Sequence, residues 1–539
     1  MKNNHAIILD CTLRDGGYYN NWDFSPEFVR GYLDSISSAG VKVVELGLRS
    51  GKNEKFMGPF AHTTDKFIGG LDLPSNLKYG VMINANELTG DVEKDSLFLQ
   101  KLFPIRANES KIKLVRIACH LHELMPAIPA INWLKFSGYE VGLNLMQITN
   151  VDLGMAKKCL REISKSSLDV FYFADSLGSL SPEMVPDILN AIKSEWSGPI
   201  GIHAHDNLGL AMANTLKANQ CGATWLDSTL TGMGRGPGNV KTEELLIEAS
   251  IAGWQEISLT STLQFIQEYL HCMKIECGWG TNPYYYLSGK YEIHPTYIQE
   301  MIGDSRFESL DILAVIDFLK TSNSKSFKQS NLSLARLFMP DEGLVGDFRP
   351  QSVIGGRDVV ILGAGKSLKT CGYALESYIK SQKPFVIALN ATKSVEENLI
   401  NLRVTCHPVR MISDTKKYEA LDQNFVMPAP PIADRLSLAL KNKKINIYGI
   451  KVEPEKFEAH NGFCILPNTL AIGYALAIAH AGDAKRIVLA GFDGYGPNDP
   501  RTHEVQSTLN LFLSNANERD LISVTPTDYK LQTKSIYGM

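Results

Sequence analysis

The stretch IGIHAHDNLGLAMANTLKANQCGATWLD, residues 200–227, carries the pattern from which we predict the fold. It begins with an apolar run, continues through polar residues and a helical pattern, and ends in a second apolar run at 224–226. Short, nearly continuous apolar runs are typical of parallel strands that are buried on both faces. A strand, a helix and a strand in this order predict one βα unit followed by the start of the next.

The same alternation extends from residue 6 to about residue 250. The β-rich apolar runs of this region are at 6–9, 41–46, 79–83, 112–117, 139–145, 170–173, 200–203 and 224–226. Eight βα units in about 250 residues predict a closed (β/α)8 TIM barrel. The alternative is an open, doubly wound parallel sheet, which the same alternation of strands and helices permits.

A barrel of this kind carries its chemistry past the carboxyl ends of its strands. His203 and His205 end the seventh run, and side chains two apart on a strand point the same way. Asp15 follows the first run and Asn239 follows the eighth, and barrel closure makes these strand ends neighbours. Two nitrogens, a carboxylate and an amide oxygen predict a site for Mn²⁺, Mg²⁺, Co²⁺ or Zn²⁺. The alternative is a histidine pair that only forms hydrogen bonds inside the barrel.

Arg14 is the candidate electrophile beside this site. A guanidinium next to a divalent cation can hold a 2-oxo acid and stabilise the enolate oxygen formed from it. Arg14 can also form an ion pair with Glu45 or Asp15, and the two roles are compatible. Glu45 ends the second run, where it could orient Arg14 or a metal-bound water.

Three segments carry a resemblance to a known family: DCTLRDGG (10–17), HAHDNLGLAMANTLKA (203–218) and DSTLTGMGRGPGNVKTEELL (227–246). Together they resemble the HMG-CoA-lyase-like (DRE-TIM) metallolyases over the whole barrel, and within that family the 4-hydroxy-2-oxovalerate aldolases. The resemblance implies a divalent metal, commonly Mn²⁺, held by Asp15, His203 and His205, with Asn239 joining in the lyase branch. It also implies that Arg14 stabilises a pyruvate enolate and that the protein is a homodimer.

Tyr18 departs from the pattern of the family. The bacterial aldolases carry a histidine base four residues after the arginine, and here that position is Tyr18. A phenol is a poorer proton acceptor than an imidazole near neutral pH. Tyr18 could donate a proton to the aldehyde oxygen, while His120, His122 or a later tyrosine serves as the base.

These residues predict a divalent-metal-dependent class II aldolase for a 4-hydroxy-2-oxo acid, with a 2-oxo acid and an aldehyde as its small-molecule partners. One alternative is a Claisen-type acyltransferase that uses acetyl-CoA, like the isopropylmalate synthases. Another is a transferase whose main activity lies in the C-terminal domain, and a third is a scaffold protein without catalysis.

Residues 251–340 predict a helical extension over the barrel, which follows the barrel domain at 1–250. Its stretch GWGTNPYYYLSGKYEIHP (278–295) contains Tyr284, Tyr285, Tyr286 and His294, which could reach over the active site or pack in the core. The polar residues of 320–350 predict a linker.

Residues 351–539 predict a second, Rossmann-like α/β domain. DVVILGAGKSL (358–368) is an apolar strand, a glycine-rich turn and a helix start, but neither a Walker A motif nor a full GxGxxG. The domain resembles sialyltransferase-like nucleotide-binding domains, which implies a nucleotide or sugar phosphate as its ligand, although the glycines also fit close packing. The candidate binding residues are Gly363, Gly365, Lys366, Ser367, Asn390 and Asp493, with His407 at the same edge.

Composition excludes several classes of protein. The 539 residues are 44% hydrophobic and 21% charged, as in ordinary globular proteins, so the chain is not mainly disordered. A net charge of −4 gives no reason to expect nucleic acid as a partner. No apolar run reaches the roughly 18 residues of a membrane span, and no signal peptide is recognisable. Nine cysteines without CxxC pairs predict reduced thiols and a cytoplasmic protein.

Overall fold

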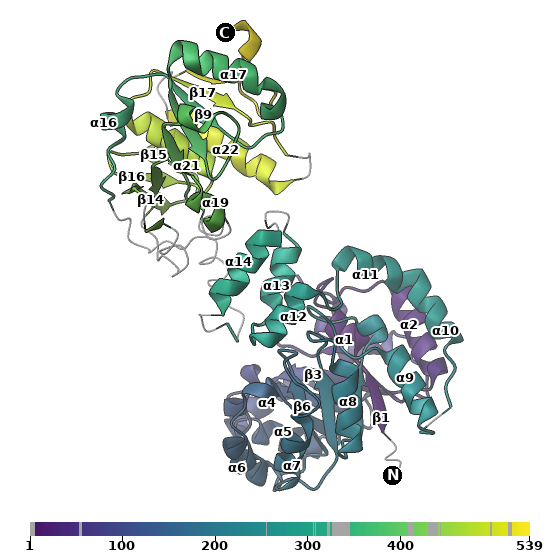
Figure 1. Cartoon of the computed structure of the whole chain (residues 1–539). Helices are drawn as coiled ribbons and strands as arrows, with labels where there is room; N and C mark the ends of the chain where they lie inside the picture. Colours follow the sequence, from purple (N-terminus) through teal and green to yellow (C-terminus); the bar gives the residue numbers. More distant parts are fainter. Residues whose placement is uncertain are drawn as a thin grey trace. The chain divides into compact units, whose positions relative to one another are not determined.

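The computed structural model describes residues 6–52, 56–254, 256–304, 307, 309–320, 324–325, 345–407, 414–421, 423–428, 440–441, 443–495, 499–515 and 520–539. The chain divides into two compact units (Figure 1). The first is Met1–Gly303 with Ser324–Ser326, and the second is Asp304–Asn323 with Phe327–Met539. The predicted linker at 320–350 falls largely outside the described residues, and the predicted boundaries at 250, 340 and 351 stay predictions.

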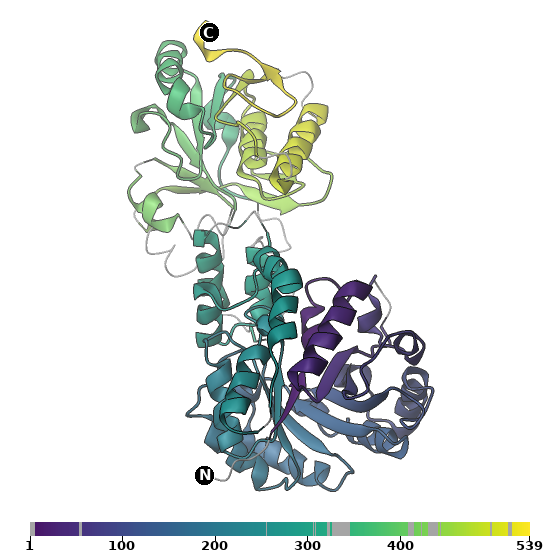
Figure 2. The same cartoon turned by 90° about the vertical axis from the view of Figure 1, so that its right-hand side faces the viewer.

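The first unit is a closed barrel of parallel strands (Figure 2). Its strands are β1 (Ile7–Asp10), β2 (Val43–Leu48), β3 (Lys78–Asn84), β4 (Ile112–Cys119), β5 (Glu140–Leu145), β6 (Val170–Asp175), β7 (Ile200–Ala204) and β8 (Trp225–Ser228). Each coincides with one of the predicted runs, with ends that differ by at most two residues. Because β1 pairs with both β2 and β8, the sheet has no edge, and the open-sheet alternative is excluded.

Helices surround the barrel and bury one face each against it. They are α2 (Pro26–Ala39), α3 (Asp65–Gly69), α4 (Val92–Leu102), α5 (Ile128–Phe136), α6 (Leu153–Ile163), α7 (Val185–Lys193), α8 (Ala211–Gln220) and α9 (Thr242–Ile251). Local sequence sets their ends, as α2 illustrates. The Ser25 side chain accepts a hydrogen bond from the Phe28 N–H before the first turn, and Gly40 ends the helix at a φ of 94°.

A short helix, α1 (Thr12–Gly16), directly follows β1 and brings its side chains to the carboxyl end of the barrel. Further helices follow α9, as predicted for this region. They are α10 (Thr260–Phe265), α11 (His271–Cys277), α12 (Pro283–Lys290) and α13 (Pro295–Ile302). The next helix, α14 (Ser309–Leu319), groups with the second unit.

The second unit contains an eight-stranded parallel sheet in the order β13-β12-β11-β10-β9-β17-β18-β19. The strands are β9 (Val359–Leu362), β10 (Phe385–Leu389), β11 (Leu402–Val404), β12 (Phe425–Met427), β13 (Ile445–Ile447), β17 (Arg486–Ala490), β18 (Asp520–Ser523) and β19 (Gln532–Thr533). The stretch INIYGI (445–450), which its β-rich sequence predicts as one strand, divides, because β14 (Gly449–Val452) joins a separate small sheet with β16 (Phe463–Leu466) and β15 (Glu458–Ala459).

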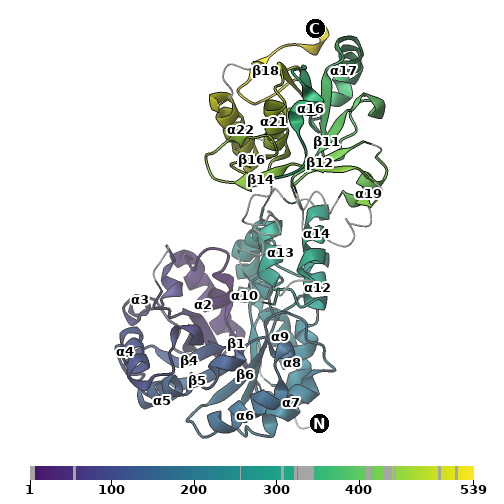
Figure 3. The same cartoon turned by 90° about the vertical axis from the view of Figure 1, so that its left-hand side faces the viewer.

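Helices cover both faces of the large sheet, as a Rossmann-like domain requires (Figure 3). Alternate side chains of β9 pack against α21 (Ala471–Ala481) and α22 (Pro500–Asn515) on one face and against α17 (Leu368–Gln382) on the other. Because β9 lies between β10 and β17, the chain reverses its winding direction there. In the part of the chain that the structure describes, no helix has the length and apolar character to cross a membrane.

Candidate metal centre and active site

Asp15, His203 and His205 meet at the carboxyl end of the barrel. Asp15 lies in α1, His203 lies in β7, and His205 follows that strand directly. One possible ligand atom from each lies within 4.8 Å of the others. The Nε2 atom of His203 is 3.6 Å from the Asp15 carboxylate and 3.3 Å from Nε2 of His205. Two ring nitrogens and a carboxylate oxygen therefore converge on one point, as the ligands of a divalent cation do.

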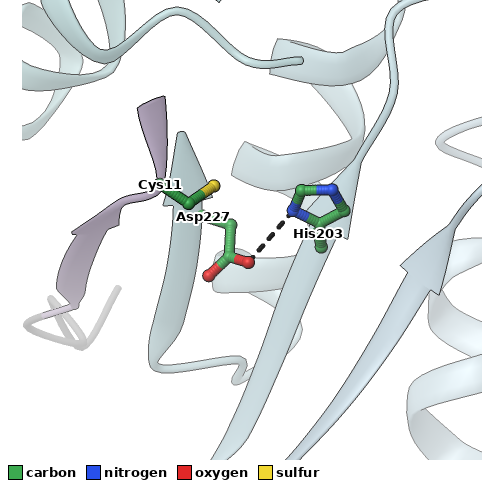
Figure 4. A group of neighbouring side chains, drawn as sticks. All are labelled: Cys11, His203 and Asp227. Carbon is green, nitrogen blue, oxygen red and sulfur yellow. Dashed lines mark hydrogen bonds and ion pairs between the residues drawn. The ribbon is translucent and has the colours of Figure 1, made fainter. Parts of the chain in front are cut away.

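Hydrogen bonds orient both imidazoles toward that point. Nδ1 of His203 lies 3.0 Å from the Asp227 carboxylate (Figure 4), and Nδ1 of His205 lies 3.2 Å from the Ser176 carbonyl oxygen. A ring that donates its Nδ1–H to such an acceptor keeps the Nε2 lone pair for a metal. Burial lowers the pKa of His205 to about 3, so this ring is in the neutral form that binds metals.

Asn239 completes the donor set. Its Nδ2 donates a hydrogen bond to Asp15, and a β-bridge joins it to His205. Its Oδ1 atom is buried and has no hydrogen-bond partner among the described residues. A buried amide oxygen without a partner, beside two imidazoles and a carboxylate, is the donor that a bound cation would satisfy. The residues therefore fit a divalent metal ion.

Gly234 allows Asn239 to come this close to Asp15. A Cβ atom at this position would lie 2.4 Å from Nδ2 of Asn239 and 3.0 Å from the Asp15 carboxylate. A larger residue at this position of the loop after β8 would therefore push Asn239 and Asp15 apart.

Arg14 forms both of the ion pairs that the sequence left open. Its Nη1 donates to Asp15 at 2.7 Å and its Nε donates to Glu45 at 2.7 Å. Burial alone would raise the pKa of Asp15, but the adjacent guanidinium holds it below its usual range. Asp15 is therefore ionised and available to a cation.

Arg116, which sequence reasoning missed, joins these side chains from inside the barrel. It donates two hydrogen bonds to Glu45 and one to Asp227, each at 2.7 Å, and lies over the ring of Tyr172. Glu45, Arg116 and Asp227 thus form a chain of alternating charges that connects Arg14 to His203. The available signal was an arginine within the apolar run of β4, where a parallel strand is expected to be apolar.

Cys11, His203 and Asp227 form a second cluster of possible ligands on the opposite side of the His203 ring (Figure 4). Asp227 already accepts hydrogen bonds from Arg116 and His203 through the same oxygen. Burial raises the pKa of the Cys11 thiol, so it stays protonated. The chemistry of the donors therefore favours the Nε2 side of His203 for a metal.

Comparison with known proteins identifies the family. The HMGL-like family model matches residues 111–269. The 4-hydroxy-2-oxovalerate aldolase 2 of Rhodococcus opacus is 30% identical over 253 residues, which cover 46% of this chain and 69% of that relative. The chain belongs to the HMGL-like family. The 4-hydroxy-2-oxovalerate aldolase of Pelotomaculum thermopropionicum is 32% identical over 249 residues. The aligned residues cover 46% of this chain and 71% of that relative.

A solved structure supports the same assignment. The N-terminal domain of a candidate aldolase from Bacteroides vulgatus is 31% identical and superposes with a TM-score of 0.50. The likeness covers 97% of that domain and 56% of this chain. The family and the fold that the three sequence segments predicted are thus confirmed.

The remaining candidate residues for proton transfer belong to the mouth of the HMGL-like barrel, at the carboxyl ends of its strands. Tyr18 is 40% exposed, and its ring packs edge-on against Trp22, 4.7 Å between centroids. His120 is half-buried and stacks on the exposed His122. Buried His294 precedes α13, and burial lowers its pKa to about 2, helped by the charges of Arg235, His205 and His120. His294 thus shares the electrostatic environment of the metal site.

The three tyrosines of α12 differ in their surroundings. Tyr285 is buried, and a Cβ atom on Gly236 would lie 3.2 Å from its ring, so it packs against the loop that carries Asn239. Tyr284 is half-buried and Tyr286 is 45% exposed.

The glycines of the second unit pack against the loop after β17. A Cβ atom on Gly363 would lie 2.4 Å from the Gly491 carbonyl oxygen, and one on Gly365 would lie 2.3 Å from the Asp493 carboxylate. Asp493 accepts hydrogen bonds from the N–H and the hydroxyl of Ser367, at the start of α17. A carboxylate therefore lies where we predicted a phosphate, and packing suffices to explain both glycines.

The other predicted residues of this unit lie at strand ends or in loops. Lys366 is exposed. Asn390 follows β10 at a φ of 52°, with a buried Oδ1 that lacks a partner among the described residues, and His407 follows β11. Nucleotide or sugar-phosphate binding by these residues stays a prediction.

Replacing Glu45 with glutamine is expected to lower the free energy of unfolding of the barrel by about 3–5 kcal/mol, because Arg14 and Arg116 lose the buried carboxylate between them. All six tryptophans lie in the first unit, so urea unfolding followed by tryptophan fluorescence measures this unit alone. The control is Glu140→Gln, which removes the partly exposed pair with Lys78 and should cost at most about 1 kcal/mol. Equal losses in the two variants would contradict the role of the buried network.

Proposed function

We propose that the protein is a divalent-metal-dependent class II aldolase that forms or cleaves the carbon–carbon bond of a 4-hydroxy-2-oxo acid through a pyruvate enolate. The observation that carries the proposal is the convergence of Asp15, His203, His205 and Asn239 beside the guanidinium of Arg14. The relatives named as 4-hydroxy-2-oxovalerate aldolases support the same reaction.

In this proposal Asp15, His203, His205 and Asn239 hold the cation, for which Mn²⁺ is our first choice, and Mg²⁺, Co²⁺ or Zn²⁺ also suit the donors. Such an ion would supply Lewis-acid stabilisation of the oxygens of the 2-oxo acid. Arg14 adds a fixed positive charge where the enolate oxygen develops, and Glu45 holds this guanidinium in place from its other side.

The reaction needs two proton transfers, one from the pyruvate methyl group to the enzyme and one from the enzyme to the aldehyde oxygen. A base removes a proton from the pyruvate methyl group, the resulting carbon attacks the aldehyde carbon, and a proton is delivered to the aldehyde oxygen; cleavage is the reverse. We propose Tyr18 and His120 for these transfers, with His294 as a third candidate. The charge of Arg235 adds to burial in lowering the pKa of His294, so this imidazole is neutral when a substrate arrives.

Proton NMR of pyruvate in D₂O tests the proposal without knowledge of the aldehyde. With the full chain and trace Mn²⁺, we expect the methyl signal to decay as deuterium enters. Removal of the metal with EDTA should stop the exchange, and added Mn²⁺ should restore it. Absence of exchange from a protein that binds Mn²⁺ would overturn the pyruvate enolate and favour acetyl-CoA condensation, which releases a free thiol.

We also propose that the enzyme serves the synthesis of a surface-polysaccharide sugar acid, on the basis of the resemblance of its second unit. Addition of pyruvate to a sugar aldehyde yields a 3-deoxy-2-oxo sugar acid, a type of product that is activated by nucleotides and used in surface polysaccharides. A fused domain for a nucleotide or sugar phosphate would suit such a pathway. Calorimetric titration of the full chain with CMP and with a sugar phosphate tests this part of the proposal. If neither ligand gives a heat of binding, this part is wrong. The homodimer and the cytoplasmic location stay predictions.

A further inference from the structure

Arg235 occupies a fixed position above the metal site. It lies between Gly234, whose backbone closely approaches Asp15, and Gly236, against which Pro295 of α13 packs. The Gly236 N–H donates to the Gln299 side chain, and the Gly236 carbonyl accepts from the hydroxyl of Tyr19. The backbone on both sides of Arg235 is therefore held in place.

The guanidinium of Arg235 differs from the other two at this end of the barrel. Arg14 and Arg116 each pair with two carboxylates. Arg235 lies over the ring of Tyr18, 5.0 Å from its centroid, and forms no ion pair with a described carboxylate. Its Nε atom is buried, and none of the described residues accepts a hydrogen bond from it. Arg235 as a whole is partly exposed, so an incoming molecule can reach its guanidinium. A buried N–H without an acceptor has a free-energy cost, and an anionic ligand bound at this guanidinium would remove it.

We propose that Arg235 binds an anionic group, a carboxylate or a phosphate, on the aldehyde that reacts with pyruvate. The inference rests on the proposed aldolase function and names the class of its second substrate. Guanidinium suits this role because its planar donors match carboxylate and phosphate oxygens.

The surroundings of Arg235 agree with a site for the second substrate rather than for pyruvate. Its stacking partner Tyr18 is 40% exposed, so this cation lies toward the mouth, whereas Arg14 is buried beside Asp15. The charge of Arg235 also adds to burial in lowering the pKa of His294, as expected for a cation on the pocket side of the loop.

The test compares aldehydes in pairs that differ in charge. Glyceraldehyde 3-phosphate is paired with glyceraldehyde, and succinic semialdehyde is paired with butanal. Pyruvate and Mn²⁺ are present in every assay, and kcat/KM for the aldehyde is measured with the full chain. We expect at least one anionic aldehyde to exceed its neutral counterpart by about 10- to 100-fold. The better pair identifies the anion as phosphate or carboxylate.

The variant Arg235→Gln should reduce this selectivity ratio to about one, and Arg235→Lys should retain part of it. The matched control is Lys290→Gln, which removes an exposed cation that lies over the exposed ring of Tyr286. The control should keep the wild-type ratio. Circular dichroism and tryptophan fluorescence of each variant verify that the barrel is folded.

The outcomes separate the two proposals. Wild-type protein that binds Mn²⁺ but does not exchange the pyruvate methyl protons overturns the aldolase function itself. Exchange with equal kcat/KM for charged and neutral aldehydes overturns only the role of Arg235. If Arg235→Gln lowers pyruvate exchange and both aldehydes in proportion, with the ratio unchanged, Arg235 serves pyruvate and the inference is wrong.

Discussion

Replacing His203 with alanine is expected to reduce metal-dependent deuterium incorporation into pyruvate to the uncatalysed rate. The variant removes one of three side chains whose ligand atoms lie within 4.8 Å of each other. One imidazole, one carboxylate and the neutral amide of Asn239 are a much weaker donor set. Calorimetric titration with Mn²⁺ should show that metal affinity falls by at least about 100-fold. Even the loss of a residue that only hydrogen-bonds to a metal ligand lowers metal affinity by about 10–100-fold.

Asp227→Asn should weaken metal binding less than His203→Ala does, because it leaves all the metal ligands in place. The amide can still contact Nδ1 of His203, but it no longer supplies the negative charge that fixes the tautomer. We expect Mn²⁺ affinity to fall by about 10–100-fold, with exchange restored at high metal concentration. His122→Ala, which changes an exposed imidazole at the same end of the barrel, is the control. Wild-type Mn²⁺ affinity in His203→Ala would place the metal elsewhere.

Replacing Arg14 with methionine is expected to lower the rate of pyruvate exchange by about 100- to 1000-fold, as does loss of one preorganised donor to a developing oxyanion. Mn²⁺ affinity should be retained, because all four donor side chains remain and the cation itself replaces the guanidinium as the positive charge beside Asp15. This split between exchange and metal binding separates Arg14 from His203. Glu45 keeps its ion pair with Arg116, so the barrel should still fold.

Arg14→Lys distinguishes geometry from charge at the same position. Lysine restores the positive charge but cannot donate at once to Asp15 and Glu45 as the guanidinium does. We expect partial recovery of exchange relative to methionine. The control is Arg161→Met, which removes an exposed arginine that pairs with Glu195 outside the barrel. A full wild-type rate in Arg14→Met would show that the guanidinium only neutralises Asp15.

The sequence predicted the barrel well because its strands are buried on both faces. Such strands are continuous apolar runs, and all eight runs became strands whose ends differ by at most two residues from those predicted. The second sheet was harder to predict, since its strands are short and one β-rich stretch, INIYGI (445–450), divides between two sheets. The side chains of this stretch contain no clear signal for a change of sheet at Tyr448.

The candidate ligands could be named from the sequence because they occupy strand ends and fit motifs. His203 and His205 have the spacing that makes neighbours on one strand point together, and Asp15 follows the first strand. Arg116 and Arg235 could not be named in this way. Arg116 is one charge within an apolar strand, and Arg235 is one charge within a glycine-rich loop, so each acquires a role only from residues far away in the chain.

The sequence by itself predicted the barrel and the side chains that can hold a metal, because these depend on periodicity and spacing along the chain, and it indicated the family through three motif segments. Only the tertiary structure decided what surrounds them. Closure of the barrel brings Glu45 and Asp227 to Arg116 across its interior, and hydrogen bonds of such long sequence separation leave no local pattern. Close approach of two loops likewise puts the Asp493 carboxylate at the start of α17, which the glycines of that turn could not reveal.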